Sequence, residues 1–239
     1  SLAIYNTLVK EIDNNHLQPS FFLGHSLGEY TALVASGIIN IADASILIKK
    51  RGELMNSAIQ PDKSGMAAII GKNALFVDKI IKDNDLDIQI ANDNSPLQVV
   101  VSGIIEEIDN SANIFLKNGV KKYVKLKVSA AFHSKFMHDA QNNLIYEINK
   151  IKFNDTNKSI ISNYDASINN EIDLIRNALK KQMANMVRWT ESIKKLEETS
   201  TKKIIEIGPG KVLSGLISRI SKKFDIISIN KVEDLNQFK

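Results

Sequence analysis

A cramped glycine–serine turn between an apolar run and a helical pattern constrains this chain more than any other feature. Residues 21–23 are apolar, residues 24–28 read GHSLG, and apolar residues then recur at helical spacing until Gly37, where a C-cap glycine would end a helix. In a G-x-S-x-G turn between strand and helix, the glycines leave room for an exposed serine hydroxyl, here that of Ser26. The backbone N–H of Leu27 can then donate to an oxyanion. A glycine–serine turn without chemistry has the same letters, so both interpretations stay open.

Composition limits the chemistry that this turn could support. The 239 residues include no cysteine, which excludes disulfides, thiolate metal sites and a cysteine nucleophile. The four histidines have no ligand-like spacing, so no metal site is expected; they are His16, His25, His133 and His138. No apolar run is long enough to span a membrane and no signal peptide is seen. We therefore expect a cytoplasmic protein, although a removed organellar transit peptide would leave the same sequence.

The net charge of +4 favours acidic or phosphorylated partners only weakly. Lys, Asn and Ile are all abundant, which a biased base composition explains equally well. The basic residues are dispersed, without a stripe that alternates with aromatic residues, so nucleic acid is not an expected partner.

Arg51 lies on the apolar stripe of a second expected helix, residues 40–59, for which Asn40 is the expected N-cap. The residues three and four positions away on this helix are all apolar, so none of them can pair with the guanidinium. A guanidinium on a core-facing stripe needs an anion from elsewhere. Either a distant Asp or Glu supplies it, or the side chain reaches the surface, or the anion is a substrate carboxylate that Arg51 binds bidentately.

Residues 64–129 predict a separate module. The expected elements are a strand at 66–70, a helix at 73–82, strands at 86–91 and 98–102, a helix at 105–117 and a strand at 122–128, with a turn at 92–96. This is βαββαβ, the ferredoxin-like order. As an insert in an α/β core it would form a lid or wall, and we expect the ligand cleft between the core and the insert.

His133 follows this module in a loop, where it could act as a base facing Ser26 or be a structural or surface histidine. Elsewhere a helix is expected at residues 2–12, and the tail from residue 231 should be loosely ordered. After residue 134 we expect a helix, then a strand at 159–162, helices at 173–183 and 189–200, a strand at 203–207, a helix at 211–220 and a strand at 225–229. The Gly-Pro-Gly at 208–210 lacks phosphate-loop spacing and predicts a tight turn.

Seven segments, taken together, resemble the malonyl-CoA:acyl-carrier-protein transacylase family of fatty-acid synthesis. In the family's order they are GHSLGEY (24–30), ADA…KKRGELM (42–55), GMAAIIG (65–71), NDNSPLQVVVSG (92–103), AFHS (131–134), KQM…VRW (181–189) and EIGPGKVLSGL (206–216). The resemblance covers nearly the whole chain. It implies an α/β-hydrolase-like catalytic core, residues 1–63 and 130–239, with an inserted ferredoxin-like subdomain at 64–129.

The resemblance also implies an activity and its residues. A malonyl group would pass from malonyl-CoA to the phosphopantetheine thiol of acyl carrier protein through a malonyl-serine ester, with no permanently bound cofactor. Ser26 matches the nucleophile, His133 the base, and Gln182 the residue whose backbone carbonyl orients that base. Arg51 matches the arginine that binds the malonyl carboxylate, and the Leu27 N–H is one oxyanion donor.

Four further residues match positions near the family's substrate pocket: Phe132, Asn92, Asn94 and Asn163. A bulky ring at Phe132 resembles the pattern of malonyl-selective members, because it leaves less room for an α-methyl group. The expected partners are acyl carrier protein and malonyl-CoA, with neither nucleic acid nor membrane, and a monomer is expected.

One departure from the family concerns the oxyanion. Family members begin with a strand and a Gly-Gln-Gly-Ser-Gln loop, and Ser1 corresponds to a point inside the family's sequence. The glutamine of that loop is the second oxyanion donor, and removing one such donor costs on the order of 10²–10³ in kcat. We therefore expect activity from a protein that has this loop and little or none from this chain alone.

Three other functions use similar motifs. A serine esterase or thioesterase would share Ser26 and His133 but would need an acidic triad member and would have no use for Arg51. An acyltransferase of a polyketide synthase would have nearly the same motifs and would differ in its carrier protein. A non-catalytic scaffold that binds a carrier protein is the third alternative, because the loop with the second oxyanion donor is absent from the sequence.

Overall fold

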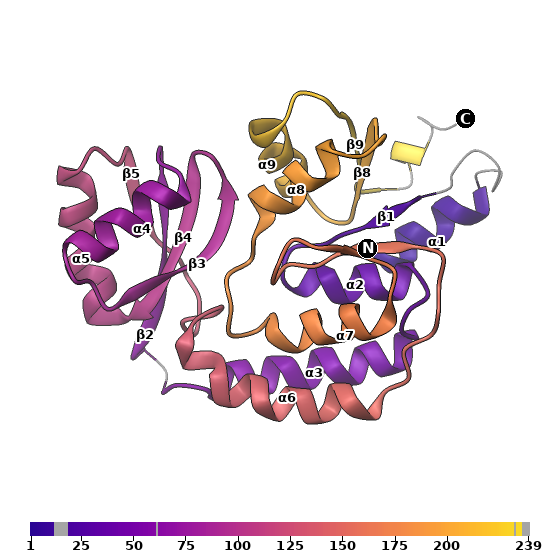
Figure 1. Cartoon of the computed structure of the whole chain (residues 1–239), viewed down its shortest axis with the longest axis horizontal. Helices are drawn as coiled ribbons and strands as arrows, with labels where there is room; N and C mark the ends of the chain where they lie inside the picture. Colours follow the sequence, from indigo (N-terminus) through magenta and orange to yellow (C-terminus); the bar gives the residue numbers. More distant parts are fainter. Residues whose placement is uncertain (12–18, 61, 232, 236–239) are drawn as a thin grey trace.

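Strands in two separate regions organise the fold (Figure 1). The structure is a computed structural model that describes residues 1–11, 19–60, 62–231 and 233–235. These residues form a three-stranded, a four-stranded and a two-stranded sheet with helices packed around them, so the expected mixed α/β class is confirmed. His16 and Ile12, the last residue of the first expected helix, lie outside the described residues.

The four-stranded sheet is built entirely from one continuous segment, on the left of Figure 1. Its strands are antiparallel in the order β3-β4-β2-β5 and comprise β2 (Ser64–Ile70), β3 (Ile88–Ser95), β4 (Gln98–Ile104) and β5 (Lys122–Lys125). Helices α4 (Ala74–Asp83) and α5 (Ile105–Lys117) pack on it, and their apolar faces bury Val77, Ile108 and Phe115. The chain order is βαββαβ, because amphipathic helices and apolar strands alternate as the sequence predicts.

Two boundaries in this region differ from the expected ones. The turn expected at 92–96 is strand instead, because Asn92 forms a bridge to Val187 while the segment also pairs with β4 through two register shifts. The last strand ends at Lys125, three residues early, and Leu126 donates one further backbone hydrogen bond to Met66.

Four helices lie below β1 in Figure 1. They are α2 (Leu27–Ala35), α3 (Ile41–Ser57), α6 (His138–Lys150) and α7 (Ile172–Lys181). The Asn40 side chain caps α3 by accepting from the Asp43 N–H, as predicted. The buried stripe of α3 contains Leu47, Arg51 and Met55, so the guanidinium does face the protein interior.

The remaining strands fall into two short groups that do not pair with each other. β1 (Phe21–Phe22) pairs in parallel with β6 (Ser159–Ile161), which pairs with the unexpected β7 (Ile168–Asn169). β8 (Lys203–Ile207) pairs in parallel with β9 (Asp225–Ile229). A cavity of about 690 Å³ lies between β1 and β8, with Phe22, Leu23, Ile204 and Leu213 among its walls. β1 and β8 therefore each have one edge that no strand of the described residues pairs.

Three helices complete this region: α1 (Leu2–Glu11), α8 (Trp189–Glu197) and α9 (Val212–Ile220). Leu8 of α1 is buried with Ile229 and with Leu235. Of the tail expected to be loosely ordered, residues 232 and 236–239 lie outside the described residues, whereas Leu235 is buried against apolar partners. None of the helices in the described ranges has both the length and the apolar character needed to cross a bilayer.

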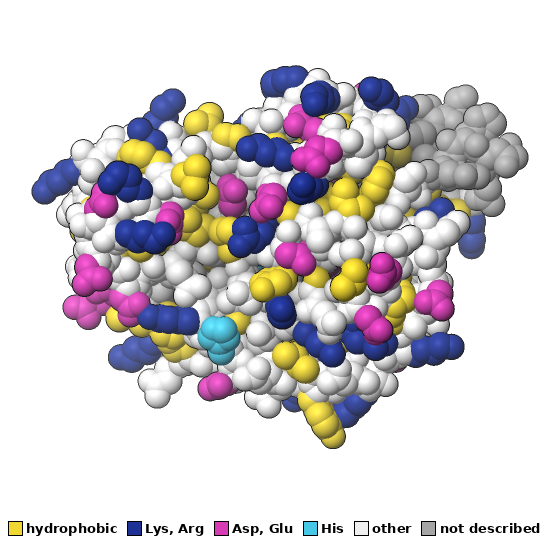
Figure 2. Space-filling view, viewed as in Figure 1, with side chains coloured by type: hydrophobic (Ala, Val, Ile, Leu, Met, Phe, Trp, Pro, Cys, Tyr) yellow, Lys and Arg dark blue, Asp and Glu magenta, His cyan; other side chains and the backbone are white. Residues whose placement is uncertain are grey.

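The surface carries its basic side chains in a scattered pattern. Figure 2 shows Lys and Arg spread over the visible face, mixed with Asp and Glu, rather than gathered into one stripe. On this face the charge pattern is the one expected from the sequence.

Candidate active site

The turn that carries Ser26 is held in a strained conformation by close packing. Ser26 has φ 52° and ψ −107°, in a half of the Ramachandran map that non-glycine residues rarely adopt. A Cβ on Gly24 would lie 2.1 Å from the backbone of Gly28, so only glycine fits there. The Asn163 side chain closes the turn, since its Oδ1 accepts from the Ser26 N–H at 2.6 Å and its Nδ2 donates to the Gly24 carbonyl at 2.8 Å.

His133 lies against the Ser26 hydroxyl although the two residues come from distant parts of the chain. The Nε2 atom is 2.8 Å from Ser26 Oγ, and Nδ1 is 3.1 Å from the backbone carbonyl of Gln182. A carbonyl can only accept, so Nδ1 carries the proton and Nε2 accepts from the serine hydroxyl. Burial, with the nearby charge of Arg51, lowers the pKa of His133 to about 3, so the imidazole is neutral at physiological pH.

Arg51 points at the same hydroxyl from α3. Its Nη2 donates to Ser26 Oγ at 2.8 Å and to Gln182 Oε1 at 3.5 Å. The side chain is only 7% exposed, and its Nε has no hydrogen-bond partner. No carboxylate of the described residues forms an ion pair with it, so the distant-carboxylate interpretation of Arg51 is not supported. A cation without an anion therefore lies beside a serine and its base.

A buried acid lies behind the turn and was missed by the sequence reasoning. Glu29 is fully buried, and its Oε2 accepts from Gln182 Nε2 at 2.7 Å and from the Asn163 N–H at 3.2 Å. Burial raises its pKa to about 7. The sequence does contain a sign of it. Glu29 lies one turn before the buried Leu33 on α2, so it is a charged residue on an apolar stripe, as Arg51 is on α3.

The other predicted residues lie at varying distances from the serine. Asn94 Oδ1 is 2.7 Å from His25 Nε2, so the four-stranded sheet reaches the turn through this contact. Phe132 packs between apolar clusters of the two regions. Asn92 contributes its backbone bridge. Leu27 begins α2 with a side chain 47% exposed, and its N–H has no partner among the described residues.

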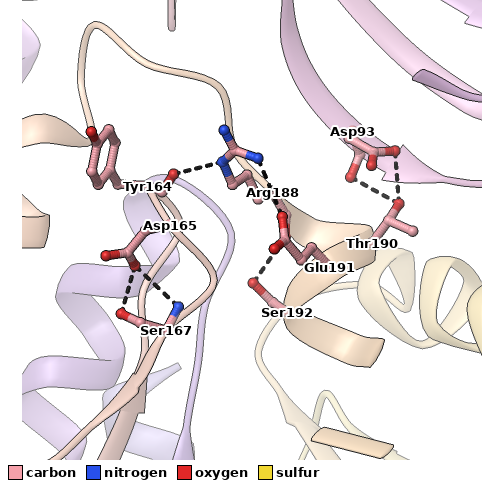
Figure 3. Close-up of polar contacts among 8 residues, drawn as sticks. All are labelled: Asp93, Tyr164, Asp165, Ser167, Arg188, Thr190, Glu191 and Ser192. Carbon is pink, nitrogen blue, oxygen red and sulfur yellow. Dashed lines mark hydrogen bonds and ion pairs between the residues drawn. The ribbon is translucent and has the colours of Figure 1, made fainter. Parts of the chain in front are cut away.

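Arg188, another residue that the sequence reasoning did not single out, fixes the segment between Gln182 and α8 (Figure 3). Its Nε donates to the Tyr164 carbonyl at 2.9 Å, and its Nη1 lies 3.2 Å from Glu191. Nearby, Thr190 Oγ1 donates to Asp93 Oδ1 at 2.8 Å (Figure 3). These contacts join the loop after β6, the start of α8 and the end of β3.

Two cavities lie near the site without including Ser26. The larger one, about 690 Å³, lies within the core and reaches the turn through Gly24, His25 and Gly28. A smaller cavity of about 360 Å³ lies where Ile90 of β3 and Leu75 of α4 face Met186. Ser26 lines neither of these two cavities, although the smaller one does lie between the segment 64–129 and Met186. A ligand cleft at Ser26 stays a prediction.

Comparison with known proteins places this geometry in a family. Residues 3–233 match the family described as acyl transferase domain. A malonyl CoA-acyl carrier protein transacylase of Bacillus subtilis (strain 168) is 36% identical over 232 residues, which cover 95% of this chain and 73% of that protein. The polyketide biosynthesis protein PksE of the same organism is 38% identical over 227 residues, 93% of this chain and 29% of that protein.

A solved structure gives the same result. The acyl carrier protein S-malonyltransferase of Vibrio cholerae has a TM-score of 0.92 at 33% identity, covering 100% of this chain and 79% of that one. These similarities extend over most of the chain, and they point to the same acyl-transfer chemistry as the geometry around Ser26. The chain therefore belongs to the malonyl CoA-acyl carrier protein transacylase family of acyl transferase domains.

Proposed function

We propose that this chain transfers a malonyl group from malonyl-CoA to the phosphopantetheine thiol of an acyl carrier protein, and so supplies fatty acid chain elongation. The single observation that carries the proposal is the shared hydroxyl of Ser26. It lies 2.8 Å from His133 Nε2 and 2.8 Å from Arg51 Nη2. His133 can activate Ser26 to attack an acyl donor, and the unpaired guanidinium of Arg51 can bind an anionic group of the same substrate.

The first half-reaction forms an ester on Ser26. His133 Nε2 takes the hydroxyl proton while Oγ attacks the thioester carbonyl. The C–S bond then breaks, and the imidazolium returns its proton to the departing CoA thiolate. The malonyl group remains on Oγ, and His133 is neutral again.

The second half-reaction reverses the roles with a different thiol. The phosphopantetheine thiol of the carrier protein gives its proton to His133 and attacks the ester carbonyl. The C–O bond breaks and the proton passes to Ser26 Oγ, which restores the enzyme. The two halves make a ping-pong cycle.

The carbonyl behind His133 sets the strength of the base. Gln182 offers a neutral carbonyl 3.1 Å from Nδ1, where a Ser-His-Asp enzyme has a carboxylate. The imidazolium is therefore less stabilised than in such a triad. A thioester needs less activation than an amide, so the weaker base suffices. The serine esterase alternative loses support here, because it needs an acid at this position.

Arg51 provides the selectivity for a terminal carboxylate. When malonyl is bound, its carboxylate can pair with the guanidinium whose Nε has no partner. An acetyl group would leave the buried cation unpaired. The side chain of Phe132 is proposed to limit space near the α-carbon, and Asn92 and Asn94 are proposed to line the substrate path.

The oxyanion that forms in each half needs N–H donors. The Leu27 N–H is proposed as one of them, supported by its position directly after Ser26 at the start of α2 and by its lack of a partner. Asn163 is better placed to hold the turn than to touch substrate, because both ends of its amide bind backbone groups of the turn.

The finer description of the fold belongs to the same proposal. We assign residues 1–63 and 130–239 to an α/β-hydrolase-like catalytic core and residues 64–129 to a ferredoxin-like subdomain. The strand order β3-β4-β2-β5 with two helices supports the second assignment. The monomeric state and the cytoplasmic location stay predictions.

A polyketide carrier is the second candidate, because PksE is 38% identical to this chain over 227 residues. The chemistry would be the same, and only the carrier would differ. Malonyl transfer to the carrier protein of fatty acid synthesis and to a polyketide carrier, measured side by side, separates the two.

Intact-protein mass spectrometry after incubation with malonyl-CoA tests the proposal. We expect a malonyl adduct that peptide mapping places on Ser26, that a Ser26→Ala variant lacks, and that disappears when phosphopantetheinylated carrier protein is added. An adduct released to water as fast as to the carrier would favour the hydrolase. A chain that binds carrier protein but is never acylated would favour the scaffold.

A further inference from the structure

A buried carboxyl group behind the nucleophile has no role in the mechanism above. Glu29 lies on the first turn of α2, three residues after Ser26, and its side chain is fully buried. An ionised carboxylate in such a place costs free energy unless hydrogen bonds or a cation stabilise it. No salt bridge to Glu29 is formed within the described residues, so its hydrogen bonds show what it does.

One carboxylate oxygen of Glu29 binds both Gln182 and Asn163, the two residues whose side chains bind the backbone of Ser26. Oε2 accepts from Gln182 Nε2 at 2.7 Å and from the Asn163 N–H at 3.2 Å. The same Gln182 nitrogen donates to the Ser26 carbonyl at 2.8 Å. Asn163 Oδ1 accepts from the Ser26 N–H at 2.6 Å. The carboxylate thus closes a ring of hydrogen bonds around both polar groups of the serine backbone.

The hydrogen bond between Glu29 and Gln182 also affects the base, His133. Gln182 presents its backbone carbonyl to His133 Nδ1 at 3.1 Å, and its side-chain Oε1 faces Arg51 Nη2 at 3.5 Å. The amide group therefore stands between a buried cation and Glu29, and reversing it would place N–H groups toward the guanidinium. Glu29 fixes the side chain of the residue whose main chain orients His133.

We propose that Glu29 is a positioning residue, whose ionised carboxylate holds Gln182 and Asn163 so that Ser26 and His133 stay in line for acyl transfer. This rests on the proposed function. Hydrogen bonds to a charged acceptor are roughly twice as strong as neutral ones. Protonation of Glu29 would therefore loosen both contacts at once.

The surroundings of Glu29 decide the pH at which this happens. The charged and titratable groups around it are Arg51 from α3, Asp165 from the loop after β6, His133 behind Gln182 and Tyr30 next to it on α2. Burial is the largest influence and raises the pKa of Glu29 to about 7. The pKa of His133 is lowered to about 3, so the base does not titrate in the same range. Reactivity of Ser26 should therefore rise with pH through about 7, following Glu29.

Stability should move in the opposite direction. The pKa of Glu29 is raised from 4.5 to about 7 in the folded protein, so folding favours the neutral acid. Its contribution to stability is complete below pH 4.5 and is lost as pH rises to about 7. A Glu29→Gln variant cannot ionise at this position, so its stability should not decrease in this way as pH rises. A positioning role thus predicts a variant that is more stable at pH 8 and yet less reactive.

The test compares Glu29→Gln and Glu29→Asp with Glu106→Gln, a control on the exposed side of α5. Two rates are measured by mass spectrometry between pH 5.5 and 8.5: malonylation by malonyl-CoA and phosphonylation of Ser26 by a fluorophosphonate. In the second reaction Oγ displaces fluoride from phosphorus, which reports the nucleophile without the thioester substrate. Thermal unfolding is followed over the same range.

We expect Glu29→Gln to lower both rates about tenfold at pH 8, as loss of an orienting partner does elsewhere, to abolish the rise near pH 7, and to raise the unfolding midpoint at pH 8. Glu29→Asp should keep a pH-dependent rise at a lower rate, and Glu106→Gln should match the wild type.

Two results would overturn the inference. One is a Glu29→Gln variant that keeps the wild-type rate and its rise near pH 7. The other is a variant that loses stability and reactivity together at pH 8, which describes a merely structural residue. A wild-type protein that reacts with the fluorophosphonate in this way but not with malonyl-CoA would refute the proposed function alone.

Discussion

The four-stranded sheet and the polar cluster around Ser26 are built by opposite routes. The sheet and its helices come from one segment, residues 64–125, and bury apolar side chains such as Phe115, Val99 and Val101. The polar cluster gathers Ser26, His133, Arg51, Gln182, Asn163 and Glu29 from distant segments through hydrogen bonds. The first region should govern stability and the second reactivity, and separate variants can test each.

The largest expected effect is on the stability of the sheet. Phe115 is fully buried and stacks on Tyr123 with ring centroids 6.0 Å apart. Phe115→Ala should lower the free energy of unfolding by about 3–5 kcal/mol, because it leaves a cavity. The matched control is Leu116→Ala, at a neighbouring position 46% exposed on the same helix, which should change it by less than about 0.5 kcal/mol. Urea titration measures both.

The contrast between the two regions would be wrong if changes in the sheet also altered the reactivity of Ser26. Phosphonylation of Ser26 in Phe115→Ala, measured where the variant is still folded, should equal that of the wild type. A slower reaction would show that the two regions are coupled.

A glycine pair in the turn gives the next largest effect. A Cβ on Gly24 would lie 2.1 Å from the backbone of Gly28, whereas a Cβ on Gly28 meets nothing within 4 Å. Gly24→Ala should cost about 3 kcal/mol and abolish reaction at Ser26, because the clash is with backbone that cannot move aside. Gly28→Ala should fold with near wild-type stability. Thermal unfolding and the fluorophosphonate reaction compare the two, and equal effects would contradict this account of the turn.

The sheet region could be predicted from sequence to a large extent, because its signals are local. Alternating apolar residues in strands and amphipathic helices predict its element order. The last strand ends at Lys125, earlier than expected, and the largest error is at 92–95, which is strand rather than the expected turn. That error has a non-local cause, since Asn92 pairs with Val187 far along the chain. The core strands are short, as in β1, and their pairing partners could not be read from periodicity.

The site was predicted unevenly for the same reason. Ser26 stood out by its motif and Arg51 by a charge on an apolar stripe, and both signals are local. The role of Gln182 came only from resemblance, because a backbone carbonyl leaves no trace in side-chain type. Glu29 is also a charged residue on an apolar stripe, but it is not among the candidate site residues predicted from the sequence. Where these residues meet depends on packing between segments, which no window of sequence contains.

The two buried titratable groups of the site provide a smaller effect. The pKa of His133 is lowered from 6.5 to about 3, so the folded protein favours the neutral imidazole. This contribution to stability is present above pH 6.5 and is lost as pH falls toward 3. His133→Asn should therefore lose less stability than the wild type between pH 6.5 and 4. Urea midpoints at each pH measure this, and parallel curves would contradict it.

The smallest expected effect is on hydrogen exchange. β4 pairs on both sides, with β2 and β3, whereas β1 and β8 each have an edge beside the 690 Å³ cavity. Amides of β4 should exchange more slowly than those of β8, because unpaired edges open more readily. Mass spectrometry of exchange at neutral pH resolves the two, and equal protection would show that the cavity edge is closed in solution.

The most direct measurement of the central claim concerns the cation beside the nucleophile. Acylation of Ser26 by malonyl-CoA and by acetyl-CoA is compared for the wild type, Arg51→Lys and Arg51→Ala. The account predicts a malonyl preference that falls about 10²-fold in Arg51→Ala and by less in Arg51→Lys, which keeps the charge but not the planar fork. An Arg51→Ala variant that still discriminates fully against acetyl-CoA would contradict it.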